Sequence, residues 1–280
     1  MPRIGWITDI HLNFLEPPQV TQWLKSLRAE GLDALLVGGD ISEALSVVDW
    51  LSRLDEALRV PIYFVLGNHD FYHGGIELVR SRVRQLGRQH PRLCFLTESP
   101  PVALTPEIGL VGHDGWADGR VGDYQRSYVM MNDYRLIEEL AGWTKLERWS
   151  LLKSLGDAAA AHISRVLPEA LRRFSSVYLL THVPPLREAC WYEGAISDDE
   201  WAPHFTCQAM GDAILSVMRD HPTKRLTVLC GHTHSPGEAT PLPNVRILTG
   251  AAKYGEPAIP QIFQLPPGVA EPQARRTPES

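Results

Sequence analysis

The sequence has little cysteine, no excess of positive charge and no long apolar run. Only four of its 280 residues are cysteine, and Cys94, Cys190, Cys207 and Cys230 form no CxxC pair. Cysteines so few and so distant argue against a disulfide-stapled fold, and we expect reduced, buried thiols. No stretch approaches the roughly 18 apolar residues of a membrane span, and the first residues do not resemble a signal peptide. We therefore expect a cytoplasmic protein with no membrane partner.

The charge balance is acidic, with 27 Lys and Arg against 33 Asp and Glu and a formal net charge of -6. Proteins that coat nucleic acid usually carry a basic surface, so this balance disfavours that class without excluding a basic groove. The most basic segment, 80–92, is interpreted as a solvated helix face. Hydrophobic residues make up 44% of the chain, enough for a sizeable core. Nothing in the composition indicates an oligomeric state.

The first hundred residues alternate between two patterns. Continuous apolar runs at 3–8, 32–39 and 60–67 are typical of buried strands, and helical spacing follows each of them, at 17–31, 42–58 and 74–87. Strands that alternate with helices need crossover connections, which produce a largely parallel sheet. The sequence therefore predicts an α/β fold.

The middle of the chain is less regular. Residues Thr144 and Glu147 fit a capping box at the start of a long helical stretch, which we expect Gly156 and Pro168 to kink or divide. We predict a single domain over 1–265 in which about 115–175 forms a helical insert or cap. Later strands are predicted at 176–185, 225–234, 245–250 and 259–265, with a helix at 208–220. The proline-rich, charged tail 266–280 is predicted to be disordered.

Polar residues follow the ends of five predicted strands. The segments are "TDIH", "GGD", "GNHD", "THVPP" and "GHTH", and their candidate ligands are Asp9, His11, Asp40, Asn68, His182, His232 and His234. In open α/β sheets, ligands bind beyond the carboxyl ends of the strands, so these side chains can converge although they span more than two hundred residues.

The donor set suggests metal. Two carboxylates, four imidazoles and one amide oxygen are too many for one tetrahedral ion. Mixed oxygen and nitrogen ligation favours Mn, Fe, Zn or Co over Mg alone. Two divalent or mixed-valence transition metal ions about 3.5–4 Å apart, bridged by one carboxylate, would use the whole set. Manganese is the first metal to test.

This order of motifs resembles the calcineurin-like metallophosphoesterase superfamily over residues 4 to 250 or so. The resemblance implies two packed mixed β-sheets flanked by helices, a four-layer α/β/β/α sandwich. It also implies that Asp9, His11 and His234 hold one ion, that Asn68, His182 and His232 hold the other, and that Asp40 bridges the two. His69 of "GNHD" is implied as the histidine near the scissile phosphate.

The expected activity is hydrolysis of a phosphate ester. Two cations allow a bridging hydroxide to form at neutral pH and attack phosphorus in line. His69, if protonated, can act as general acid, and Asp70 can orient His69 or a metal ligand. A small or nucleotide-like phosphodiester is the preferred substrate. The alternatives are a phosphomonoesterase, a nuclease, which the acidic charge balance disfavours, and a non-catalytic interaction protein, which the complete ligand set disfavours.

Four residues are candidates for substrate contact: His113, Arg120, Tyr72 and Trp191. His113 and Arg120 lie in or beside a glycine-rich loop after a strand, and an arginine there would suit a phosphate oxygen. Tyr72 follows "GNHD" and Trp191 follows "THVPP". Five of the eight tryptophans fall between Trp116 and Trp201. They suit core packing of the long helix, with a cap that stacks a nucleobase as the alternative.

Overall fold

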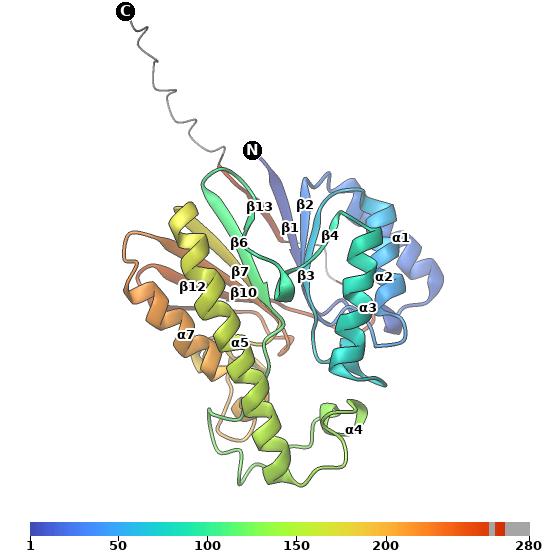
Figure 1. Cartoon of the computed structure of the whole chain (residues 1–280). Coiled ribbons are helices and arrows are strands. Elements are labelled where there is room, and N and C mark those ends of the chain that lie inside the picture. The colour runs from blue at the N-terminus through green and yellow to red at the C-terminus, as the bar shows by residue number, and fades with distance from the viewer. Residues whose placement is uncertain (258–260, 267–280) are drawn as a thin grey trace, which may run out of the picture.

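The computed structural model describes residues 1–257 and 261–266. Two β-sheets pack face to face in it, and helices cover their outer faces (Figure 1). This confirms the predicted mixed two-sheet architecture. The predicted disordered tail lies outside the described residues except for Pro266.

The first sheet has the order β13-β1-β2-β3-β4. The strands are β1 (Arg3–Ile7), β2 (Ala34–Gly38), β3 (Ile62–Val65), β4 (Leu93–Phe95) and β13 (Gln261–Gln264). Strands β1 to β4 run parallel, and β13 pairs antiparallel with β1 at the edge. The parallel strands are connected through α1 (Pro17–Ala29), α2 (Val47–Leu58) and α3 (Ile76–Gln89), as the alternating pattern predicts.

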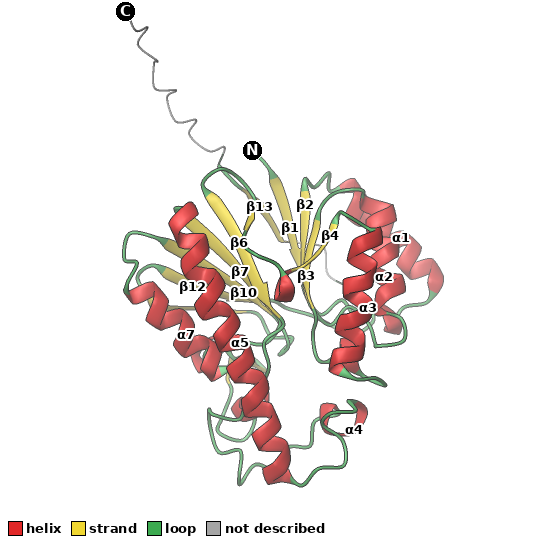
Figure 2. Cartoon of the chain, viewed as in Figure 1, coloured by secondary structure: helices red, strands yellow, loops and turns green. Residues whose placement is uncertain are grey.

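The second sheet has the order β11-β12-β10-β7-β6-β5. Its strands are β5 (Val102–Ala103), β6 (Ile108–His113), β7 (Ser176–Thr181), β10 (Arg225–Cys230), β11 (Gly237–Leu242) and β12 (Val245–Thr249). The four central strands are parallel, and β5 and β11 are antiparallel edges. Helices α5 (Lys145–Arg173) and α7 (Gln208–Arg219) cover its outer face (Figure 2).

The central strands are apolar on both faces because each face is buried. In β2, Leu36 packs between the two sheets, while Leu35 and Val37 pack under the helices of the first half. Successive side chains of a strand point to opposite faces, so a strand in the middle of such a sandwich has no polar side. A third cluster, including Ile163 of α5 and Ile214 of α7, fills the space behind the second sheet.

Helix α5 begins as the sequence predicts, with Thr144 and Glu147 forming a capping box. The predicted division at Gly156 and Pro168 is wrong, because the helix runs unbroken over 29 residues. A proline inside a helix costs about 3 kcal/mol, and the buried face around Val166, Leu167 and Leu171 offsets that cost. At Gly156, an added Cβ would lie 2.6 Å from the Asp118 Cβ, so glycine permits a close loop contact.

The segment between β6 and α5 consists mainly of loops and the short helix α4 (Asp133–Leu136). After β7 come further short elements, β8 (Trp191–Tyr192), β9 (Ala195–Ile196) and α6 (Ala202–Phe205). Within the described ranges, no helix is long and apolar enough to cross a membrane.

Candidate metal centre

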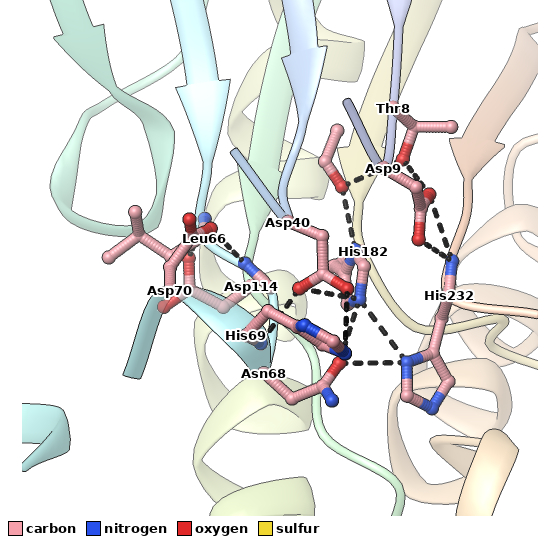
Figure 3. A network of polar contacts seen from close by, with 12 residues as sticks. Thr8, Asp9, Asp40, Leu66, Asn68, His69, Asp70, Asp114, His182 and His232 are labelled. Carbon is pink, nitrogen blue, oxygen red and sulfur yellow. Dashed lines mark hydrogen bonds and ion pairs between the residues drawn. The ribbon is translucent and has the colours of Figure 1, made fainter. Parts of the chain in front are cut away.

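Loops at the carboxyl ends of strands from both sheets meet at one place (Figure 3). Asp9 and His11 follow β1, Asp40 follows β2 and Asn68 follows β3. From the second sheet, His182 follows β7, and His232 and His234 follow β10. All seven predicted ligands are therefore brought together at the shared end of the two sheets.

Five of these seven residues have left-handed backbones. The φ angles are 52° at Asp9, 42° at His11, 50° at Asp40, 73° at His232 and 57° at His234. Residues other than glycine seldom adopt positive φ, and each instance costs about 1–3 kcal/mol when the surrounding structure enforces it. Such a concentration indicates loops that are shaped for a site rather than for stability.

The glycines of two motifs make room for carboxylates. An added Cβ at Gly67 would lie 2.1 Å from Asp40 Oδ1, and one at Gly231 would lie 2.0 Å from Asp9 Oδ2. Any larger residue would displace an acidic side chain from the centre. The glycine before Asn68 and the glycine before His232 are therefore required by close packing.

The first donor set consists of Asp9, His11, Asp40 and His234, each of which offers one atom within 4.8 Å of the others. The Nε2 atoms of His11 and His234 are 3.1 Å apart. Asp9 Oδ1 lies 3.3 Å from His234 Nε2, and Asp40 Oδ2 lies 3.7 Å from His11 Nε2. Two carboxylate oxygens and two imidazole nitrogens thus face a common point.

The second donor set consists of Asn68, His182, His232 and the other oxygen of Asp40. Asn68 Oδ1 lies 3.1 Å from His182 Nε2 and 2.9 Å from His232 Nδ1. Asp40 Oδ1 lies 3.4 Å from His182 Nε2. Because Oδ1 of Asp40 faces this set and Oδ2 faces the first, the carboxylate is placed to bridge two ions.

The hydrogen bonds of the imidazoles fit a cation. Gly38 O lies 2.9 Å from His182 Nδ1, and His204 O lies 3.1 Å from His232 Nε2. A carbonyl oxygen only accepts, so each of these nitrogens carries the proton. The remaining nitrogens, His182 Nε2 and His232 Nδ1, are 3.2 Å apart and present lone pairs to each other. Two facing lone pairs repel unless a cation lies between them, so the residues fit a bound metal.

Burial keeps the imidazoles neutral. Desolvation lowers the pKa of both His11 and His232 to about 3, and it also lowers the pKa of His182. The two acids differ. Burial, followed by the charge of Asp9, raises the pKa of Asp40. At Asp9 burial opposes ionisation, but the electrostatic interaction with the His182 ring and the hydrogen bond to His234 outweigh it and hold the pKa well below its usual range. Neutral imidazoles are the form that binds metal.

His69 lies beside the centre. Its backbone N–H donates to Asp40 Oδ1 at 2.8 Å, and its ring packs 4.6 Å from His11 and 4.3 Å from Tyr72. The ring nitrogen Nε2 is 3.9 Å from Asp40 Oδ2. Burial, followed by the neighbouring His11 and His182, lowers the pKa of His69 to about 2. The imidazole is therefore neutral before a substrate arrives.

Asp70 contacts loop backbone instead of the ring of His69. It accepts hydrogen bonds from the N–H groups of Ile41, Ser42 and Gly67, at 2.8–2.9 Å. These bonds tie together the two loops that carry Asp40 and Asn68. Of the two predicted roles for Asp70, its contacts fit the positioning of ligands rather than the orientation of His69.

Two of the four residues proposed to contact substrate make other interactions instead. Arg120 pairs with Asp118 at 2.9 Å and with Asp157 at 2.7 Å. His113 is buried at the end of β6, where its Nδ1 accepts from the Gly115 N–H at 3.0 Å. Sequence spacing alone did not reveal these partners. His113 is therefore buried, and the exposed Arg120 guanidinium is already paired with two carboxylates.

The other two candidates differ in their contacts with the centre. Tyr72 donates its hydroxyl to Asp133 at 2.7 Å and packs on His69, so it belongs to the centre. Trp191 is half-buried and packs against Gly237, where an added Cβ would lie 1.9 Å from its ring.

The tryptophans do not form one cap. Trp116 packs against Phe71 in the core, and Trp149 stacks on Tyr124. Trp201 instead stacks on Phe205 and lines a cleft beside His69. Core packing therefore accounts for Trp116 and Trp149, whereas Trp201 lies where a substrate can reach it.

Two residues of the site were not predicted from the sequence. Asp133 is buried in α4 and bonds to both Asn68 and Tyr72. Tyr254 has its ring centre 4.5 Å from that of His11 and 4.9 Å from that of His234. Asp133 lies in an irregular segment, and Tyr254 follows the predicted strand 245–250 by four residues without belonging to a motif, so the sequence carries no clear local signal for either.

Comparison with known proteins agrees with this geometry. Residues 2–236 match the model of the calcineurin-like phosphoesterase family. The chain therefore belongs to that family, and together with the cluster of Asp and His side chains this indicates a metal-dependent phosphohydrolase. No curated protein gives a significant sequence match.

Solved structures share the fold. A phosphopantetheinyl hydrolase from Mycobacterium tuberculosis is 17% identical with a TM-score of 0.63, and the match covers 91% of this chain and 90% of that one. A dimetal phosphatase from Danio rerio is 14% identical with a TM-score of 0.53, and the match covers 89% and 87% respectively. At these identities the likeness concerns the fold alone.

Proposed function

We propose that the protein hydrolyses a small phosphodiester with two transition metal ions, Mn²⁺ being the first to test. The observation that carries this proposal is the Asp40 carboxylate, which turns one oxygen to each donor set. When bound, the two ions lower the pKa of a water and offset the negative charge of the phosphate. Asp9, His11 and His234 would hold one ion, and Asn68, His182 and His232 the other.

In this proposal His69 delivers a proton to the departing oxygen. The neutral ring lies at the edge of the centre, and its Nδ1 is buried without a hydrogen-bond partner among the described residues. An anionic ester beside the ring favours the charged imidazolium and so raises the pKa of His69. His69 then gains a proton as the substrate binds and loses it to the leaving group.

A cleft beside His69 supports a small substrate. Its volume is about 430 Å³, and Tyr72, Tyr128, Trp201 and Tyr254 contribute aromatic side chains to its walls. Glu200 is the one acidic residue in the described lining, which contains no Lys or Arg. Aromatic walls suit a planar or apolar group esterified to the phosphate.

The same lining disfavours nucleic acid as a substrate. Binding to duplex DNA depends mainly on Lys and Arg contacts to successive phosphates. The described cleft offers none, and the chain carries a formal net charge of -6. A small diester needs only one phosphate contact, which the metal centre supplies.

A substrate panel tests the proposal. Phosphomonoesters, cyclic nucleotides, phospholipid diesters and single-stranded DNA are assayed with added Mn²⁺, with Asp40→Ala as the metal-site control. We expect kcat/KM to be highest for small diesters and to fall by several orders of magnitude in the control. Faster turnover of monoesters would reassign the enzyme as a phosphomonoesterase. Tight, salt-sensitive inhibition by duplex DNA would favour a nuclease instead.

A further inference from the structure

A buried carboxylate from the segment between β6 and α5 contacts a metal ligand. Asp133 of α4 is 6% exposed and lies 65 residues from Asn68 in the sequence. Its Oδ1 accepts from Asn68 Nδ2 at 2.8 Å and from the Tyr72 hydroxyl at 2.7 Å. The Tyr72 oxygen in turn lies 3.2 Å from Asn68 Nδ2. The three side chains form a closed hydrogen-bonded triangle.

The chemistry of this triangle fixes which way the Asn68 amide faces. An ionised carboxylate only accepts hydrogen bonds, so the amide nitrogen must face Asp133. Tyr72 gives its proton to Asp133 and therefore accepts from the same nitrogen. Both amide donors are thereby used, and Oδ1 is turned toward His182 and His232. A flipped amide would present donors, which cannot bind a cation.

We propose that Asp133, supported by Tyr72, is a positioning residue that holds the Asn68 amide oxygen toward the second ion. The inference rests on the proposed binuclear site and adds to it a requirement from outside the family motifs. Residues behind a ligand typically change metal affinity by about 10–100-fold when they are removed.

The backbone around Asp133 is hydrogen-bonded to the loop that follows Asn68. The His73 N–H donates to Leu136 O at 2.8 Å, and the Glu138 N–H donates to Gly74 O at 3.0 Å. The Glu139 carboxylate accepts from the Ile76 N–H at the start of α3, at 2.9 Å. The segment that carries Asp133 and the loop after Asn68 therefore keep a fixed spacing, so Asp133 can hold the amide without moving.

Calorimetric titration of the metal-free full chain with Mn²⁺ tests the proposal without a substrate. Asp133→Asn can offer an amide nitrogen to Asn68 and so permits the flipped orientation. We expect it to weaken the second ion by about 10–100-fold and to leave the first ion within about twofold. Tyr72→Phe keeps the carboxylate and should weaken the second ion by about 2–10-fold, the value of one hydrogen bond.

Asp55→Asn is the matched control. Asp55 is a buried carboxylate of α2 that pairs with His90 and Arg92. Its replacement should lower thermal stability without changing the affinity for either ion. The control therefore distinguishes the general effect of removing a buried carboxylate from the specific effect of losing the orientation of the Asn68 amide.

Exchange of the two side chains at positions 68 and 133 is the most discriminating test. In the double variant Asn68→Asp/Asp133→Asn, donor and acceptor exchange places, and position 68 again turns an oxygen to the ion. We expect Asn68→Asp to strengthen binding of the second ion at least about tenfold more in the Asp133→Asn background than in the wild type, a coupling that independent sites do not show.

Additive effects in this cycle, or an unchanged second ion in both Asp133→Asn and Tyr72→Phe, would overturn the inference. So would a wild-type chain that binds a single ion at saturating Mn²⁺. If the wild type binds two ions and the cycle is coupled, yet no ester is hydrolysed, the proposed function fails while the positioning role stands.

Discussion

The two donor sets of the metal centre are held in different ways. In the second set, the outer atoms of Asn68, His182 and His232 are bonded to Asp133, Gly38 and His204 respectively. In the first set, His11 Nδ1 is buried without a partner among the described residues, and the His234 side chain is 22% exposed. The second set is preorganised by these bonds, whereas in the first set only Asp9 is held in this way, by the Thr8 hydroxyl and the His232 N–H, and the two histidines depend more on the ion itself.

Two sites with similar donor atoms can therefore differ in their affinity for the ion and in how fast they exchange it. A preorganised site loses little conformational entropy on binding and holds its ion tightly. A less constrained site adjusts more easily and exchanges its ion faster.

Asp40→Ala should have the largest effect because its two oxygens serve both donor sets. We expect kcat/KM to fall by about 10⁴-fold, beyond the 10–100-fold typical of residues behind the ligands. Asp9→Ala, which affects only the first set, should cost less. Steady-state kinetics and elemental analysis at saturating Mn²⁺ check both variants, and equal losses would argue against a bridging carboxylate.

His69→Ala should retain both ions and lose turnover, because His69 is proposed as a proton donor and not as a ligand. The loss on an unactivated diester should be about 10²–10⁴-fold, the range of general acid catalysis. A bis-nitrophenyl diester, whose leaving group needs no proton, should lose far less. Equal losses on the two substrates would remove the general-acid role, and loss of both ions from a folded variant would make His69 a ligand.

The affinities of the two sites should differ by about 10–100-fold, with the second set binding more tightly. Calorimetry of the metal-free chain with Mn²⁺ should then resolve two steps. His234→Ala should abolish the weaker step, and His232→Ala should abolish the tighter one. The reverse assignment would show that hydrogen bonds behind the ligands do not control affinity here.

The smallest effect concerns a buried histidine outside both sets. Burial lowers the pKa of His113 to about 3, below the value of about 6.5 in an unfolded chain. Its contribution to stability is therefore present above pH 6.5 and is lost as the pH falls. At pH 5 the loss should reach about 2 kcal/mol.

Urea unfolding of the wild type and of His113→Asn, at pH 7.5 and pH 5, measures this loss. The stability difference between the two proteins should shrink at pH 5 by that amount. A constant difference would show that His113 keeps its ordinary pKa despite its burial.

The sequence predicts the regular part of this protein well. Strands buried on both faces, such as β2, give continuous apolar runs, and each ligand motif directly follows such a run, as Asp40 follows β2. Local rules therefore placed the seven candidate ligands at one edge. The same rules failed at Pro168, where tertiary packing outweighs a local helix-breaking tendency.

The residues behind the ligands could not be predicted in the same way. Asp133, which bonds to Asn68, lies in a segment without hydrophobic periodicity. Arg120 pairs with Asp157, which is 37 residues away in the sequence. Such partners are set by how distant segments pack. One sequence shows which side chains have the right chemistry but not which of them are already paired.

The unbroken helix α5 has a mechanical consequence. Leu152 packs with the hydrophobic cluster of the first half, and Ile163 packs with that of the second. The segment before the helix is hydrogen-bonded to the loop behind β3, through His73 and Gly74. Helix and segment together form a brace between the two sheets beside the metal centre. A force that separates the sheets would load this brace in parallel with the ligands and with the apolar layer between the sheets, so the brace shares the strain with both.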